Sequence, residues 1–454
     1  MRGVRYKTRM KTPQQPELVI EQPIPADVRP SVRVKRPQRR QVQWRDASLD
    51  QLVPKDHRVR LVWAYVEAID TRPLYQSIQA VEGGVGRDAV DPRILLALWM
   101  HAIIEGISSA RHLARLCQRD IVYQWICGEV GVNHHLLSDF RVQQGAFLEQ
   151  LLTDTIATLL HQNLITLETV AQDGMRVRAS AGSSSFRRQP TLEKCREEAA
   201  AHLQKLREEA DDHPDASPTR QRAAADRAAR ERAEQVAAAL AQLAELQAQK
   251  EERKKGSGKD ARGSTTDPEA RRMKMANGGF QPAYNVQFVT TGDTRMIVAV
   301  EVTNNGSDGG QLATMHAALS QRHGQTPGRY LVDGGFATIE DITQVEQAGT
   351  QVFAPQLYAE RIVQRGGDPH ARRARDTDEM AAFRQRMASD EAKELYKQRP
   401  SIAEFPNAQC RNYGLQQFRV RGLKKVRATS LWYVIVFNFQ RLLTLGWLSH
   451  LGVA

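Results

Sequence analysis

Residues 169–181 read TVAQDGMRVRASA, and the alternation of two sets of side chains, one of them mostly apolar, predicts a β-strand. Ala171, Met175 and Val177 would share one face of this strand with Asp173, because side chains two positions apart point the same way. A carboxylate that is buried without a partner is costly. Asp173 on an apolar face therefore indicates a functional site, where the carboxylate has a partner, as well as a strand.

A predicted β-hairpin and a helix come later in the chain. Residues 284–290 (YNVQFVT) and 296–302 (MIVAVEV) flank the turn at 291–293 (TGD), which is a hairpin signal. Asp308 is then expected to cap a helix that runs to residue 319. The predicted order is strand, two-stranded hairpin and helix.

A second acid ends the next predicted strand. Residues 330–332 (YLV) are followed by Asp333, two glycines and a helix at 338–348, and a last strand is expected at 351–354. This order predicts an RNase H-like α/β domain with a mixed sheet, in which the first strand pairs with the strand after the first helix. Asp173 and Asp333 would then converge. Two carboxylates at such a short distance repel each other unless cations separate them. The pair therefore favours binding of two Mg2+ ions.

Positive charge is concentrated at the N-terminus. The 454 residues have a net charge of +12, and residues 1–45 hold 12 Lys/Arg against 3 Asp/Glu. Prolines punctuate the same stretch, which predicts an extended basic arm over residues 1–50. We interpret this arm either as a phosphate-binding segment or as a solvated tail.

The composition excludes several classes of protein. With 41% hydrophobic and 26% charged residues, the chain is neither collagenous nor wholly disordered. Its most apolar run, residues 431–437, is far shorter than the ~20 residues that a membrane span needs. No apolar segment follows the basic N-terminus as in a secretory signal. Four cysteines are too few for a disulfide scaffold, so we expect a cytoplasmic, nucleoid-associated protein with no membrane partner.

Residues 51–165 predict an N-terminal all-α module. Its candidate helix N-caps are Asp91, Ser109, Asp120 and Ser138. The first three would open short helices, and the last a long helix that ends near residue 161. Short helices joined by tight turns are typical of helix-turn-helix DNA binders. Arg111 and Arg115 are candidate DNA contacts, and a solvated helix face explains them about as well.

Two cysteines and two histidines in this module suggest a zinc site that we reject. Cys117, Cys127, His134 and His135 do not have the spacing of a tight zinc knuckle. Both cysteines fall on apolar helix faces, where core packing is the better interpretation.

Residues 190–262 predict an antiparallel helical hairpin inserted into the catalytic domain. Apolar residues repeat at steps of three and four in its first half: Leu192, Cys195, Ala199, Leu203, Leu206 and Ala210. A break at 211–218 separates them from a second helix rich in Ala, Arg, Glu and Gln. The catalytic domain would then comprise residues 166–189 and 263–427, followed by a C-terminal helix at 428–454.

Six segments together resemble the insertion-sequence DDE transposases, most like the eleven-eighty-two group. They are GRDAVDPRILLALWMHAIIEGISSARHLARLC (86–117), VNHHLLSDFR (132–141), VAQDGMRVRASAG (170–182), MKMANGGFQPAYNVQF (273–288), LVDGGFA (331–337) and EAKELYKQR (391–399). The resemblance implies an RNase H-like catalytic domain with two Mg2+ ions, for which Mn2+ would substitute. It also implies double-stranded DNA partners, namely terminal inverted repeats and target DNA, and at least a homodimer in the synaptic complex. No small-molecule substrate is expected.

The resemblance further implies a third acid on a late helix. Relatives carry a Tyr-x2-Arg-x3-Glu-x6-Lys signature, which Tyr396, Arg399, Glu404 and Arg411 match with one extra residue before the glutamate and Arg in place of Lys. Glu391 and Glu394 are alternatives to Glu404, which could also be an ordinary first-turn acid. Because prolines interrupt the segment, we expect one helix to end near Arg399 and a second to begin around residue 401.

These residues predict a transposase mechanism. Asp173, Asp333 and Glu404 would hold two metal ions for DNA cleavage and strand transfer, and Tyr396, Arg399 and Arg411 would grip phosphates near the scissile strand. Residues 418–427 are basic, and phosphate contact or a charged surface explains them equally well. Two alternative functions stay open: a catalytically silent DNA-binding protein and a plain metal-dependent nuclease.

Overall fold

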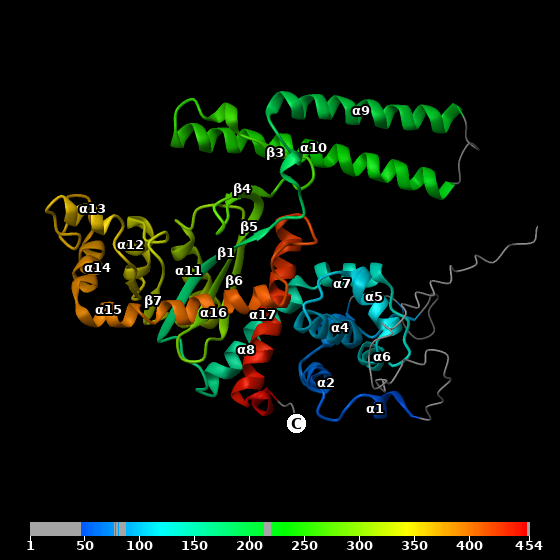
Figure 1. Ribbon diagram of the computed structural model, residues 1–454, viewed down its shortest axis with the longest axis horizontal. Helices are drawn as coiled ribbons and strands as arrows, with labels where there is room; N and C mark the ends of the chain where they lie inside the picture. Colours follow the sequence, from blue (N-terminus) through cyan, green and yellow to red (C-terminus); the bar gives the residue numbers. More distant parts are fainter. Residues whose placement is uncertain (1–46, 77, 79, 81–87, 213–218, 452–454) are drawn as a thin grey trace, which may run out of the picture. The chain divides into compact units, whose positions relative to one another are not determined.

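The computed structural model describes residues 47–76, 78, 80, 88–212 and 219–451 (Figure 1). The basic arm expected at residues 1–50 lies outside the described residues up to position 46. Its last residues instead begin the first short helix, where the Ser48 side chain accepts a hydrogen bond from the backbone N–H of Gln51. The helical part therefore starts slightly earlier than expected.

Eight helices precede the first strand in the described residues. They are α1 Leu49–Leu52, α2 Arg58–Ala68, α3 Arg72–Tyr75, α4 Pro92–Ile104, α5 Ala110–Arg119, α6 Ile121–Cys127, α7 His134–Gln143 and α8 Gly145–His161. The expected caps of α4, α5 and α6 are confirmed, since Asp91, Ser109 and Asp120 each accept a hydrogen bond from a first-turn backbone N–H.

The single long helix expected from Ser138 is wrong. The chain forms two helices that break at Gln144, and the side chain of Asn133, not Ser138, caps the first of them. Gly145 begins α8 where the C-terminal helix passes close by, because a Cβ at that position would lie 3.4 Å from the Cβ of Ala428. The sequence pattern does not reveal this break.

The sheet has the strand pairing expected from the sequence. Its strands are β1 Thr169–Arg178, β4 Arg271–Lys274, β5 Phe280–Thr291, β6 Ile297–Thr303, β7 Arg329–Leu331 and β8 Gln351–Phe353. The order is β4-β5-β1-β7-β8, with β6 also paired to β5. The sheet is mixed, because β1 is antiparallel to β5 and parallel to β7. The predicted pairing of the first strand with the strand after the first helix is therefore confirmed.

Further helices alternate with these strands and follow them. They are α11 Gln311–His323, α12 Ile339–Gln347, α13 Ala359–Gln364, α14 Asp378–Ala388, α15 Asp390–Tyr396, α16 Arg399–Asn412 and α17 Leu423–Leu445, with short 3-10 helices η1 Ser183–Ser185, η2 Gly258–Asp260 and η3 Leu448–Leu451. The C-terminal helix expected at 428–454 begins earlier, at Leu423, and ends before Gly446, whose φ is 72°. Among the helices described, none is both long and apolar enough to cross a membrane.

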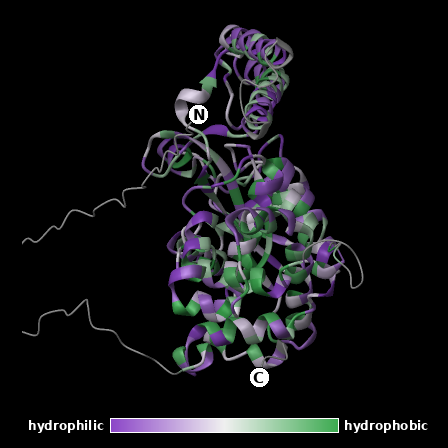
Figure 2. Cartoon of the chain, turned by 90° about the vertical axis from the view of Figure 1, so that its right-hand side faces the viewer, coloured by the Kyte–Doolittle hydropathy of each residue, from purple (hydrophilic) through white to green (hydrophobic). Residues whose placement is uncertain are grey.

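Helix α17 joins the N-terminal helices to the sheet in one hydrophobic core. Its Trp432 indole donates a 2.9 Å hydrogen bond to the carbonyl of Arg141 in α7. On another side, the amide of Asn438 bonds both the N–H and the carbonyl of Ile297 in β6. Figure 2 shows hydrophobic residues gathered in this part of the chain.

Two long helices, α9 Gln189–Asp212 and α10 Thr219–Arg253, occupy the segment where the hairpin is expected. They run side by side in Figure 1 and share a small apolar cluster that includes Leu192, Ala239 and Leu243. Strand β2 (Phe186–Arg187), just before α9, pairs with strand β3 (Gly263–Ser264), which follows α10, and the two form a small sheet. Figure 2 shows many polar residues along this pair of helices.

Candidate active site

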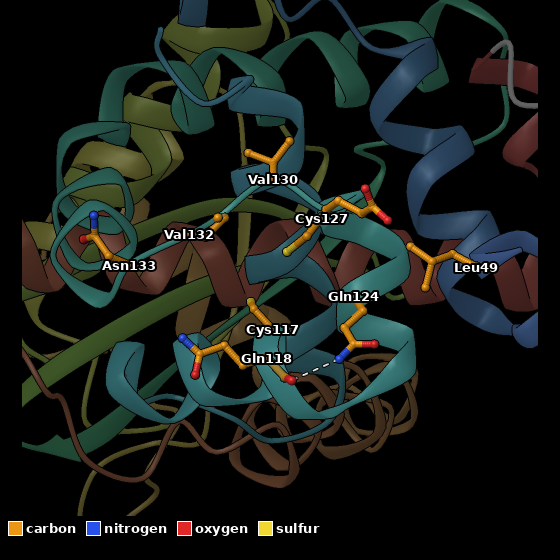
Figure 3. A pocket seen from close by; sticks show the side chains of 10 residues that line it. Leu49, Cys117, Gln118, Gln124, Cys127, Val130, Val132 and Asn133 are labelled. Carbon is orange, nitrogen blue, oxygen red and sulfur yellow. Dashed lines mark hydrogen bonds between the residues drawn. The ribbon is translucent and has the colours of Figure 1, made fainter. Parts of the chain in front are cut away.

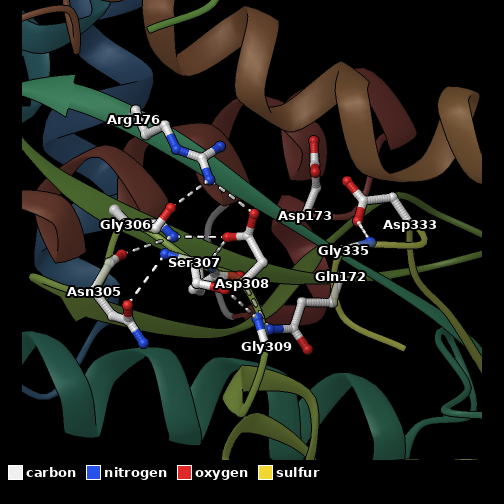
Figure 4. Close-up of polar contacts among 12 residues, drawn as sticks. Gln172, Asp173, Arg176, Asn305, Gly306, Ser307, Asp308, Gly309, Asp333 and Gly335 are labelled. Atoms are coloured by element: carbon white, nitrogen blue, oxygen red, sulfur yellow. Dashed lines mark hydrogen bonds and ion pairs between the residues drawn. The ribbon is translucent and has the colours of Figure 1, made fainter. Parts of the chain in front are cut away.

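The two aspartates lie side by side on neighbouring parallel strands. Ala171 of β1 pairs with Leu331 of β7, and each lies two residues before its aspartate. Asp173 and Asp333 therefore extend from the same level of adjacent strands, which are separated by about 4.8 Å. Figure 4 shows the two carboxylates beside each other. The convergence predicted from the strand order is present.

One guanidinium lies among all three predicted acids. Arg399 Nη2 is 2.9 Å from Asp173 Oδ1 and 3.9 Å from Asp333 Oδ2, and its Nη1 is 3.5 Å from Glu404 Oε1. Arg399 is buried, whereas the Glu404 side chain is 60% exposed. Glu404 and the two aspartates thus share one cationic neighbour, Arg399.

The helix boundaries around the third acid differ from the prediction. Helix α15 ends at Tyr396, and α16 begins at Arg399 instead of near residue 401. Pro400 is tolerated there because the first helical positions need no backbone N–H donor. Glu404 consequently lies in the second turn of α16, so the first-turn interpretation of this acid is wrong.

Asn407 is a site residue that the sequence reasoning missed. Its Nδ2 donates a 2.7 Å hydrogen bond to Asp173 Oδ2, while its Oδ1 is buried without a hydrogen-bond partner among the described residues. Asn407 lies one helical turn after Glu404, so both side chains project from one face of α16. That spacing is the signal that points to it.

Burial and charge shift the pKa of Asp173. Removal of this carboxyl group from water raises its pKa from 3.8 to about 6, and the neighbouring carboxylate of Asp333 adds to the rise, while Arg399 opposes it. Burial likewise raises the pKa of Tyr396, which is half-buried beside the same acids. The site therefore disfavours its own negative charge and would gain from additional positive charge.

A buried polar cluster supports the strand next to Asp173 (Figure 4). Asp308 does not cap a helix, so that expectation is wrong; its carboxylate accepts hydrogen bonds from Asn285 (2.7 Å), Gln287 (3.0 Å) and Arg176 (2.9 Å). A Cβ on Gly174 would lie 2.5 Å from Gln287 Nε2 and 2.7 Å from Asp308 Oδ1. Glycine after Asp173 leaves the space that this cluster fills.

The N-terminus of α11 is satisfied by another acid. Asp341 of α12 accepts hydrogen bonds from the backbone N–H groups of Gly310 and Ala313, at 2.7 and 3.1 Å. Helix α11 starts after Gly310, whose φ is 82°. The carboxylate of Asp341 thus caps α11, a role that the sequence pattern assigned to Asp308.

Two family models match the chain. A transposase domain (DUF772) matches residues 47–143, and a transposase DDE domain matches residues 253–439. The chain belongs to the DDE transposases. Asp333 and Glu404 lie inside the second match, and Asp173 precedes it. Neither the search of curated proteins nor the search of solved structures found a match to the transposase.

The donor set of the transposase suits a hard divalent cation. Asp173, Asp333 and Glu404 offer carboxylate oxygens, the ligands that Mg2+ prefers. As placed here, no group of three or more His, Cys, Asp and Glu residues in the described part of the chain lies close enough together to hold a metal ion. The guanidinium of Arg399 lies between the acids instead. The three carboxylates fit the ion by their chemistry.

Other predicted site residues lie on exposed surfaces. Arg111 and Arg115 are exposed on α5, and Arg411 is exposed near the end of α16. None of these three contacts the acids. The alternatives Glu391 and Glu394 are exposed on α15, where Lys397 forms an ion pair with Glu394.

The cysteines of the helical part line a cavity of about 500 Å³ (Figure 3). Cys127 is buried and Cys117 half-buried, and the neighbouring Cys127 thiol together with burial raises the pKa of the Cys117 thiol. The rejection of a zinc site at these cysteines stays a prediction.

Proposed function

We propose that this transposase cleaves the ends of its element and joins them to target DNA in an RNase H-like catalytic domain. The observation that carries the proposal is the meeting of Asp173, Asp333 and Glu404 around one buried cation, although they are far apart in the chain. The strand order β6-β5-β1-β7-β8 supports the RNase H-like assignment.

The charge balance of the site explains why divalent ions are needed. Three carboxylates and one guanidinium leave two negative charges, which repel an incoming phosphodiester. Bound Mg2+ would activate the attacking oxygen and stabilise the leaving one. Asp173, Asp333 and Glu404 would hold the ions, and Asn407 would fix the orientation of the Asp173 carboxylate.

Arg399 would exchange partners when substrate binds. Its guanidinium holds carboxylates here, and the same planar fork fits the oxygens of a phosphate. Tyr396 is half-buried at the end of α15, and Arg411 is exposed on α16, the helix that also carries Arg399. Both would contact DNA near the scissile strand. The helical part, with Arg111 and Arg115 exposed, would bind the terminal inverted repeats, and two copies would hold two ends.

Cleavage of labelled element ends in Mg2+ tests this proposal. Asp173→Asn, Asp333→Asn and Glu404→Gln should each abolish both cleavage and strand transfer, and Glu391→Gln serves as an exposed control that should retain both. Cleavage that persists in the aspartate variants would remove these residues from the mechanism. Cleavage without strand-transfer products in the wild type would instead make the protein a plain nuclease.

A further inference from the structure

A groove of about 940 Å³ lies between helix α10 and the edge of the sheet. Figure 1 shows α10 beside β4, and a 2.8 Å hydrogen bond from Arg271 of β4 to Gln242 of α10 fixes the two together. The groove is separate from the three acids. Neither the sequence reasoning nor the family matches assign it a role.

Five cationic side chains line this groove. They are Arg188, Lys250, Arg262, Arg271 and Arg272. Arg262 and Arg272 are exposed, and their side chains have no hydrogen-bond or ion-pair partner within the described part of the chain. Phe280 adds an aromatic ring that is 56% exposed. Unpartnered Lys and Arg side chains are typical of surfaces that neutralise nucleic-acid phosphates.

The acids in the lining are already engaged. Asp260 forms an ion pair with Arg188 at 3.0 Å, and Glu269 accepts the backbone N–H of Leu423 at 2.8 Å. Glu245 accepts a hydrogen bond from Gln249. With five Lys/Arg side chains against three Asp/Glu, the lining has a net charge of +2, so an incoming ligand meets positive charge.

The groove lies at one edge of the sheet whose central strand carries Asp173. Gly306 lines the groove, and its carbonyl accepts a 3.1 Å hydrogen bond from Arg176, which lies three residues after Asp173 on β1 and therefore points to the opposite face of that strand. Arg271 lies across β5 from Arg178, because both pair with Ala283. Five strand residues separate Asp173 from Arg178, about 16 Å, which is close to the length of five base pairs.

We infer that this groove binds the phosphodiester backbone of the same duplex DNA whose strand is cut at Asp173 and Asp333. The inference rests on the proposed function, since it assumes that DNA occupies the acid site. Helix α10 then forms one wall of a DNA channel, and Arg262 and Arg272 neutralise backbone phosphates outside the acid site. Affinity gained there is independent of base sequence.

The test measures affinity of the full-length protein for a 40-base-pair fluorescent duplex over a range of salt concentrations. The double variant Arg262→Ala with Arg272→Ala should lower the slope of log K against log[salt] by about 2, since each lost phosphate contact removes about one unit. The matched control is Arg227→Ala with Arg232→Ala, two exposed arginines of α10 outside the groove lining. The control should keep the wild-type slope.

An unchanged slope in the groove variant, or an equal loss in both double variants, would overturn the inference. Circular dichroism and the melting temperature show that each variant is folded. Cleavage by the wild type distinguishes failure of the groove proposal from failure of the proposed function. If the wild type cuts DNA and the groove variant keeps the wild-type slope, only the groove proposal is contradicted. A wild type that neither binds nor cuts DNA defeats the proposed function as well.

Discussion

Arg399 and Asp173 form an ion pair of 2.9 Å in which both side chains are largely buried. The pair joins the start of α16 to the centre of the sheet, at the place where the acids converge. Breaking a buried ion pair by removal of one partner is strongly destabilising, because the other charge stays buried without compensation. In the metal-free protein, Arg399 therefore has a structural role besides any contact with DNA.

Removal of Arg399 should destabilise the metal-free protein. We expect Arg399→Ala to lower the free energy of unfolding by about 3 kcal/mol at pH 8 in the presence of a chelator. The exposed Arg411→Ala on the same helix should change it by less than about 0.5 kcal/mol. Denaturant unfolding of both variants measures the difference, and equal midpoints would show that the pair contributes nothing.

Asn407 should act by holding the Asp173 carboxylate. Loss of a hydrogen bond to a charged group costs about 1.5–3 kcal/mol, so Asn407→Ala should lower cleavage about 10- to 100-fold. It should also raise the Mg2+ concentration needed for half-maximal rate, which a change elsewhere in the fold would leave alone. Asn412→Ala, at an exposed asparagine of the same helix, is the matched control. An unchanged Mg2+ dependence in Asn407→Ala would remove it from the site.

The raised pKa of Asp173 should make stability depend on pH. Its folded-state pKa of about 6 exceeds the ordinary value of 3.8, so the folded protein binds this proton more tightly between the two values. The free energy of unfolding should therefore fall as pH rises from 4 to 6, by about 3 kcal/mol in total.

Substitution isolates this contribution. Asp173→Asn, studied by denaturant unfolding with a chelator present, should lack this part of the pH dependence, whereas Glu391→Gln should keep it. Cleavage by the wild type should also decline below pH 6, because the protonated carboxyl group is a poor ligand. An Asp173→Asn variant with the wild-type pH profile of stability would show that the carboxyl group titrates normally.

Gly174 should not tolerate a side chain. In Gly174→Ala the new Cβ would displace the amide of Gln287 and the carboxylate of Asp308, which are held in a buried cluster. We expect a loss of about 1–3 kcal/mol in stability and lower cleavage. Gly182→Ala is the control, since its nearest neighbour would be 3.5 Å away. Thermal melting compares the two, and equal melting temperatures would contradict the steric argument.

Much of the sheet and two of the acids are predictable from the sequence, for identifiable reasons. The period-2 pattern around Asp173 and the strand that ends at Asp333 depend on local residue type. Their pairing follows from element order alone. Local caps such as Asp91 and Asp120 are equally readable, because the capping oxygen and its N–H lie within three residues of each other.

The errors occur where distant contacts decide the structure. Asp308 has the sequence context of a cap, yet it binds Arg176 across the sheet while Asp341 caps the helix. The break at Gln144 lies beside α17, next to Ala428, which is far away in the sequence. Arg176 and Asp308 are 132 positions apart, and Gly310 and Asp341 are 31 apart, so no local pattern contains these contacts.

Oxidative cleavage by Fe2+ bound in place of Mg2+ tests most directly whether the three acids share a cation site. With ascorbate and peroxide, the iron should cut the wild-type chain near residues 173, 333 and 404 together, and Asp173→Asn or Asp333→Asn should suppress all three cuts at once. Cuts confined to other regions, or an unchanged pattern in both variants, would contradict the account.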